Sequence, residues 1–129
     1  MPKTLPSLAQ VDSYPVPELL VPRIMKNYKR SQEFAEAIVR EAKRMLLLHH
    51  ASHEPICPSI EIDDAWHEMM LFTRFYQEFC AFLGGFVDHE PEPEGDVPTN
   101  SGGTSVYDLT LRNYQKYFGV EPDQRYWTP

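Results

Sequence analysis

Cysteine, glycine and long apolar runs are all scarce in this chain of 129 residues. The two cysteines, Cys57 and Cys80, are too few for the disulfide framework of a small secreted domain. The longest apolar runs, such as residues 45–48 and 69–72, are far shorter than the roughly 18 to 20 residues that a membrane-spanning helix needs. The first residues lack the apolar core of a secretory signal. We therefore expect a cytoplasmic protein with reduced thiols and no membrane segment.

Positive charge is also in short supply. Twelve Lys and Arg stand against 19 Asp and Glu, which gives a formal net charge of −7 at pH 7. Such a protein repels phosphate backbones, and no basic cluster offsets this locally, so we expect no nucleic-acid partner. The motifs G-x-G-x-x-G, P-loop, G-x-S-x-G and C-x-x-C are absent. These absences remove the most easily recognised nucleotide-binding, hydrolase and redox classes.

Apolar residues are abundant enough for a core. Hydrophobic residues make up 42% of the chain and aromatic residues 12%, which predicts a single folded domain over residues 1–129. The twelve prolines leave residues 23–54, 59–90 and 99–121 free of proline. Because proline breaks helix interiors, these three windows are where long helices can form. No alternating strand pattern is present, so the sequence predicts an all-α fold.

The predicted architecture is a small helical bundle with two long antiparallel helices. The first long helix begins after Ser31 as N-cap and carries its apolar period through His49. The second begins at Asp63 or Asp64 as cap and ends at Gly84. Its aromatic stripe is assigned to the core and comprises Trp66, Phe75, Tyr76, Phe79 and Phe82.

The remaining segments are shorter or irregular. An additional C-terminal helix is predicted from about Ser105 to Gly119, and a short helix around residues 17–28. Residues 1–16 are predicted to form an extended N-terminal segment. Residues 89–103 form a Pro/Gly-rich acidic loop without periodicity, which we expect to be mobile.

Histidines gather around the connection between the two long helices, at positions 49, 50, 53 and 67. An antiparallel helix pair would bring the end of the first helix beside the start of the second and gather these side chains. Asp63 precedes His67 by four residues, which places both on one helical face. Imidazole and carboxylate ligands suit Zn²⁺ or Fe(II). The strongest candidate metal ligands are His67 and Asp63, with His49, His53 and His89 as completing ligands.

The same residues also have a structural interpretation. His49 and His50 can end a helix, where imidazole satisfies free carbonyls and meets the negative end of the helix dipole. His53 can be a loop residue, and Asp64 can simply hold His67. On this interpretation no metal is bound.

The two cysteines have different predicted relations to a metal site. Two histidines and a carboxylate with open positions would allow catalysis, whereas a shell closed by Cys57 would be structural. Cys80 lies 13 residues after His67, which in a continuous helix places it about 20 Å away, so we assign it to the core. A break in the helix between residues 72 and 80 would remove this objection.

The stretch from residue 58 to residue 91 resembles the glycine-rich domain-containing protein-like family. The shared core of that family reads approximately P-S-x-x-V-D-x-x-W-H, followed by Cys, Gly and a closing H-x-P. The matching positions here are Pro58, Ser59, Asp63, Trp66, His67, Thr73, Tyr76, Cys80, Gly84, His89 and Pro91. Together with similar flanking segments, the resemblance covers about residues 25–129.

The resemblance implies an all-helical module, but it implies little about chemistry. Met69 and Asp88 stand where members of that family often have histidine, which leaves fewer ligands for any metal site shared with that family. The glycine-rich segment that gives that family its name is missing here, which removes any RNA-binding role attached to such a segment.

Three functional hypotheses follow. The first is a small cytosolic helical domain that binds a divalent metal through His67 and Asp63. The second is a metal-free protein interaction module, in which Asp63 caps a helix, Trp66 fills the core, His67 bonds to the loop and the acidic loop meets a protein partner. The third is a mononuclear iron oxygenase-like enzyme that uses two histidines and a carboxylate.

Overall fold

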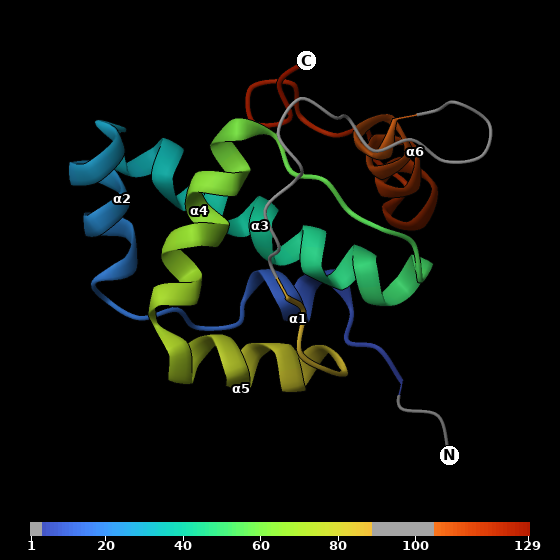
Figure 1. Ribbon diagram of the computed structural model, residues 1–129, viewed down its shortest axis with the longest axis horizontal. Helices are drawn as coiled ribbons and strands as arrows, with labels where there is room; N and C mark the ends of the chain where they lie inside the picture. Colours follow the sequence, from blue (N-terminus) through green and yellow to red (C-terminus); the bar gives the residue numbers. More distant parts are fainter. Residues whose placement is uncertain (1–3, 89–104) are drawn as a thin grey trace.

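The computed structural model describes residues 4–88 and 105–129. Within these residues all helices are α-helices and no strand occurs, which confirms the predicted all-α fold (Figure 1). The helices are α1 (Leu8–Asp12), α2 (Leu20–Tyr28), α3 (Gln32–Ser52), α4 (Ile60–Leu71), α5 (Thr73–Leu83) and α6 (Val106–Phe118). The predicted acidic loop at residues 89–103 lies outside the described residues.

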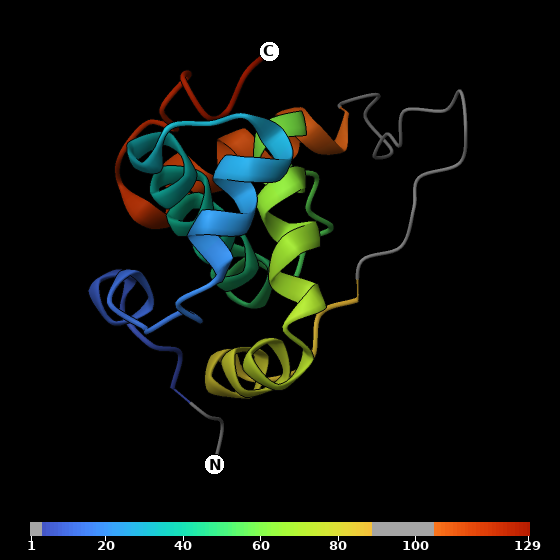
Figure 2. The ribbon, with the colours of Figure 1, turned by 90° about the vertical axis from the view of Figure 1, so that its left-hand side faces the viewer.

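The long helix α3 is the element around which the others pack. Ser31 caps it as predicted, since its Oγ accepts a hydrogen bond from the N–H of Phe34 at 3.1 Å. No glycine or proline interrupts its 21 residues, and it contacts each of the other five helices. Figures 1 and 2 agree that α1 and α5 lie at one end of the molecule and α6 at the opposite end.

The prediction of a second long helix is wrong, because the second proline-free window holds both α4 and α5. The chain turns at Phe72, which leaves the helical conformation with φ −89° and ψ 73°. The turn lays α5 across the end of the bundle, where Phe79 and Phe82 pack against the ring of Tyr14 at centroid distances of 5.0 and 4.9 Å. A straight helix over both segments would be about 36 Å long and would carry this aromatic face away from the core.

The predicted start of the second helix is also wrong. The N-cap of α4 is Ser59, not Asp63 or Asp64, because the Ser59 Oγ accepts a hydrogen bond from the N–H of Ile62 at 3.2 Å. The residue before it is Pro58, which disfavours a helical conformation for residue 57 and so helps to set where the helix begins.

The connection between α3 and α4 is an extended segment and not a tight turn. Residues 53–59 are non-helical, and seven extended residues can span about 20 Å. Figure 1 shows this connection running back along α3, so that α4 begins far from the C-terminal end of α3 and crosses it. The predicted antiparallel pair is therefore wrong. Pro55 and Pro58 explain the extended path, because neither proline nor the residue before it favours a helical turn.

The N-terminal segment is not wholly extended as predicted. Residues 8–12 form α1, which is stabilised by a reciprocal capping box between Ser7 and Gln10. The side chain of Val11 is fully buried against the core, and this tertiary contact offsets the cost of forming so short a helix.

The C-terminal helix forms as predicted. Ser105 caps α6, Gly119 ends it with φ 74°, and the remaining chain to residue 129 returns to the core. Tyr126 and Trp127 are 5% and 2% exposed there. In the described part of the chain, none of the helices is both long enough and apolar enough to cross a membrane.

Candidate functional site

Two of the histidines at the end of α3 form hydrogen bonds with backbone carbonyls. His49 Nδ1 lies 2.9 Å from the carbonyl oxygen of Glu54, and His50 Nε2 lies 2.9 Å from that of Gly85. A carbonyl can only accept, so each of these ring nitrogens donates its proton. Burial lowers the pKa of His50, which favours its neutral form. His53 is the exposed C-cap of α3, with φ 57°.

The other predicted metal ligands lie elsewhere. His67 and Asp63 are on α4, where the His67 side chain is exposed and Asp63 is half-buried. His89 lies outside the described residues. The structure brings the rings of His49 and His50 together, with 5.7 Å between their centroids, but the described residues contain no group of three or more His, Cys, Asp or Glu side chains that could hold a metal ion. A site that includes His89 stays a prediction.

Trp66 of the D-x-x-W-H motif closes a buried chain of hydrogen bonds. Its side chain is 5% exposed, and its Nε1 donates to the hydroxyl of Tyr76 at 2.9 Å. That hydroxyl donates in turn to the carbonyl oxygen of Val87 at 2.5 Å. Burial raises the pKa of Tyr76 and that of the neighbouring Cys80 thiol, so both groups stay protonated at neutral pH. The motif thus ties α4 to α5 and to the chain that follows α5.

Cys80 and all residues of the aromatic stripe except Trp66 lie on α5. Cys80, Phe79 and Tyr76 are buried in the core as predicted, Phe75 packs at its edge, and Phe82 stacks on the ring of Tyr14. The helix does break at Phe72, so the distance argument that separated Cys80 from His67 no longer holds. Cys80 instead interacts with the Tyr76 side chain and the Val87 backbone inside the core.

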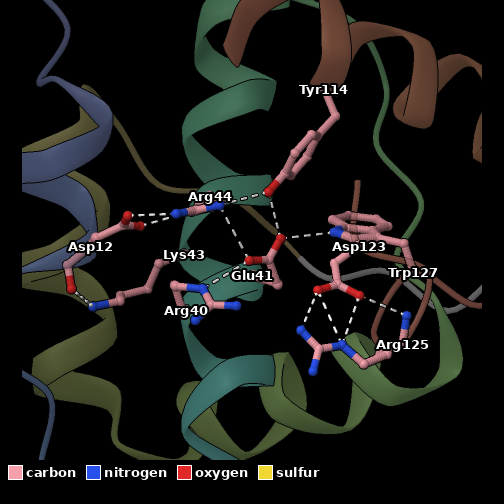
Figure 3. A network of polar contacts seen from close by, with 9 residues as sticks. All are labelled: Asp12, Arg40, Glu41, Lys43, Arg44, Tyr114, Asp123, Arg125 and Trp127. Carbon is pink, nitrogen blue, oxygen red and sulfur yellow. Dashed lines mark hydrogen bonds and ion pairs between the residues drawn. The ribbon is translucent and has the colours of Figure 1, made fainter. Parts of the chain in front are cut away.

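Sequence reasoning missed a buried ionic network on α3 (Figure 3). Its centre is Glu41, which is 1% exposed. Its Oε1 accepts hydrogen bonds from the Tyr114 hydroxyl at 2.6 Å and from Trp127 Nε1 at 3.0 Å. Its Oε2 accepts one from Arg40 Nε at 2.9 Å and lies 3.4 Å from Arg44 Nη1. The buried carboxylate is thus compensated by four donors from α3, α6 and the C-terminal residues.

The network continues to the N-terminal end of the chain. Arg44 donates to both carboxylate oxygens of Asp12, at 2.9 and 2.7 Å, and its Nη1 donates to the Tyr114 hydroxyl at 2.9 Å. Lys43, which is 4% exposed, donates through Nζ to the carbonyl oxygens of Asp12 and Tyr14, both at 3.0 Å. The segment of α3 from residue 40 to residue 44, about one and a half helical turns, therefore holds residues 12–14 near the N-terminus and the C-terminal Trp127 against this helix.

A signal for this network was present in the sequence. The buried stripe of α3 includes Ala35, Ile38, Met45 and Leu48, and Glu41 falls within it at helical spacing. A carboxylate at a core position needs partners, since an isolated buried charge is costly. The sequence could indicate that Glu41 is paired, but not with which residues.

A cleft adjoins the network. Its volume is about 550 Å³, which is within the range of small-molecule sites. One wall is a face of α3, a second is the chain between α1 and α2, and the third is the C-terminal segment. The lining residues are Asp12, Tyr14, Pro15, Val16, Val21, Glu33, Glu36, Ala37, Val39, Arg40, Lys43, Arg125 and Tyr126. A second cleft of about 360 Å³ lies on the other side of the C-terminal segment, beside Leu111 and Trp127.

Comparison with protein families places most of the chain in a family. A model of the UCP032817-like family matches residues 7–102. No curated protein and no solved structure matches the chain.

The resemblance to the glycine-rich domain-containing protein-like family is therefore wrong. The residues that carried it have structural roles here. Ser59 begins a helix, Trp66 and Tyr76 form a buried hydrogen bond, and Gly84 ends α5 with φ 130°. Helix caps, core aromatics and terminating glycines recur in unrelated helical proteins, so such a pattern is weak ground for a family assignment.

Proposed function

The chain belongs to the UCP032817-like family, and we propose that within this family it acts as a metal-free protein interaction module in which the D-x-x-W-H motif is structural. The observation that carries this proposal is the buried hydrogen-bond chain from Trp66 through Tyr76 to Val87. These hydrogen bonds explain why the motif contains Trp66, because this side chain fills the core and donates to Tyr76. The motif then requires neither metal nor substrate.

Two roles in this module belong to residues other than those that the sequence predicts. Ser59, and not Asp63, is the cap of α4. His50, and not His67, bonds to the chain after α5, through the Gly85 carbonyl. Asp63 makes other interactions, and His67 is exposed.

The partner that we propose is a basic protein. The net charge of −7 favours association with a positively charged surface and opposes nucleic acid. Glu90, Glu92 and Glu94 concentrate part of this charge in one short stretch of the sequence. We also propose a cytoplasmic location, which is supported by the free thiols of Cys57 and Cys80.

Elemental analysis separates this function from metal binding. The tag-free protein, purified without added metal, is compared with His67→Ala prepared in parallel. We expect neither zinc nor iron at stoichiometric levels in either sample, and no change in Tm when a chelator is added. Near-stoichiometric metal that disappears in the His67→Ala variant would instead establish the predicted metal site and overturn the proposal.

The interaction itself is tested by affinity capture. The natural chain is compared with a variant in which Glu90, Glu92 and Glu94 are replaced by Gln. Capture of a basic protein that weakens in the variant and at high salt supports the proposal. Capture that is insensitive to both changes contradicts the proposed partner.

A further inference from the structure

The 550 Å³ cleft beside the Glu41 network is not used by the proposed interaction function. Its walls combine charged side chains with apolar ones, among them Val16, Val21 and Ala37, and Tyr126 closes one side. Such a cleft can bury an apolar group of modest size. The charged side chains at the edge of the cleft then determine which charged group the ligand must have next to its apolar part.

Arg40 is a cation held in place at this edge. Its Nε donates to the buried Oε2 of Glu41 at 2.9 Å, while its side chain is 40% exposed. Within the described part of the chain, its two terminal nitrogens make no hydrogen bond. A guanidinium that is oriented from behind by a buried carboxylate, with its outer donors free, is arranged to bind an anionic oxygen at little entropic cost.

Arg125 lies at the same edge. Its Nε and Nη2 bond to the carboxylate of Asp123, which leaves Nη1 without a hydrogen bond among the described residues. The guanidinium groups of Arg40 and Arg125 both lie over the ring of Tyr126, at 5.9 and 5.2 Å from its centroid. The two arginines thus flank the aromatic side of the cleft.

Other charges limit which anion fits. Glu33 and Glu36 also line the cleft, and the Glu36 carboxylate accepts a hydrogen bond from Gln32 at 2.8 Å. These carboxylates repel groups with a charge of −2, such as a phosphate, more strongly than groups with a charge of −1. Lys43 adds positive charge at the inner wall, although its Nζ is occupied by two carbonyls.

We propose that this cleft binds a carboxylate attached to an apolar group, with the carboxylate at Arg40 and Arg125 and the apolar group against Val16, Val21 and Tyr126. The carboxylate can belong to a free organic acid or to the C-terminus of a peptide. The inference uses different residues from the proposed interaction function, so either can fail without the other.

The test is a titration followed by ¹H–¹⁵N NMR spectra, with N-acetyl-leucine as the probe and N-acetyl-leucine amide as the matched neutral control. We expect the acid to bind with a Kd of about 0.1–1 mM and the amide about tenfold more weakly. The indole signal of Trp127, which shares Glu41 with Arg40, should shift. The indole of Trp66, bonded to Tyr76 in another part of the core, is the internal reference.

Variants locate the site. Arg40→Lys keeps a cation beside Glu41 but removes the planar fork, and Arg125→Gln removes the exposed cation. Each should weaken binding of the acid by about three- to tenfold. Arg74→Gln, an exposed arginine on α5 that does not line the cleft, should leave binding unchanged.

The possible results are distinct. Equal binding of acid and amide, no binding at all, or binding that neither cleft variant weakens would each overturn the proposal. Discrimination between acid and amide that depends on Arg40 and Arg125 supports it. An acetylated tripeptide ending in leucine then identifies the source, because tighter binding than N-acetyl-leucine indicates a peptide C-terminus and equal binding indicates a free acid.

Discussion

At the scale of single residues, the buried carboxylate of Glu41 should contribute strongly to the stability of the fold. It is buried on α3 and accepts from Tyr114, Trp127 and Arg40. The variant Glu41→Leu retains a large side chain that is compatible with a helix. It should lower the free energy of unfolding by about 3–5 kcal/mol, because it leaves the surrounding donors without their acceptor. Urea denaturation measures this loss. Glu36→Leu, an exposed change of the same chemistry on the same helix, should change stability by less than about 0.5 kcal/mol; equal losses would contradict the role given to Glu41.

At the scale of elements, Tyr76 joins α4, α5 and the chain beyond α5. Tyr76→Phe removes one hydroxyl and leaves the Trp66 N–H and the Val87 carbonyl without this shared partner. We expect a loss of about 1–3 kcal/mol and faster amide hydrogen exchange in residues 85–88. Tyr117→Phe on α6, where the side chain is 44% exposed, is the control and should have almost no effect. Unchanged exchange at residues 85–88 in the Tyr76 variant would contradict the proposed link.

At the scale of the whole molecule, the C-terminal residues complete a core that begins at α1. They lie beyond residue 102, where the family match ends, yet Trp127 Nε1 donates to Glu41 at 3.0 Å, and Ser59 donates to the Tyr126 carbonyl at 2.5 Å. Trp127→Ala should therefore destabilise the entire fold by about 3–5 kcal/mol in a single cooperative transition, as measured by thermal or urea unfolding. Val120→Ala, at a side chain that is 50% exposed, serves as the control. A separate early transition in the Trp127 variant would mean that the C-terminal segment is an independent appendage.

The local pattern of the sequence was sufficient for the fold class and for several helix ends. Proline-free windows, the caps at Ser31 and Ser105, and Gly119 act over one or two turns, so they can be recognised without knowledge of the rest of the chain. The same local information failed at Phe72, because the apolar period of α4 continues into α5. A bend there depends on α5 packing against Tyr14, a residue far away in the sequence.

For the candidate sites too, the sequence identified some features, and the fold alone decided the others. The sequence alone identified the histidines, the acidic residues and Trp66 as chemically notable, and it placed Trp66 and Tyr76 in the core. Only the tertiary structure decided that residues 53–59 run back along α3, which separates His49 and His53 from the start of α4. It alone joined Glu41 to Tyr114 and Trp127, 73 and 86 residues further along the chain. Helix caps depend on neighbouring residues, whereas the partners of a buried charge depend on how distant elements pack, and that packing follows from the balance of the whole core.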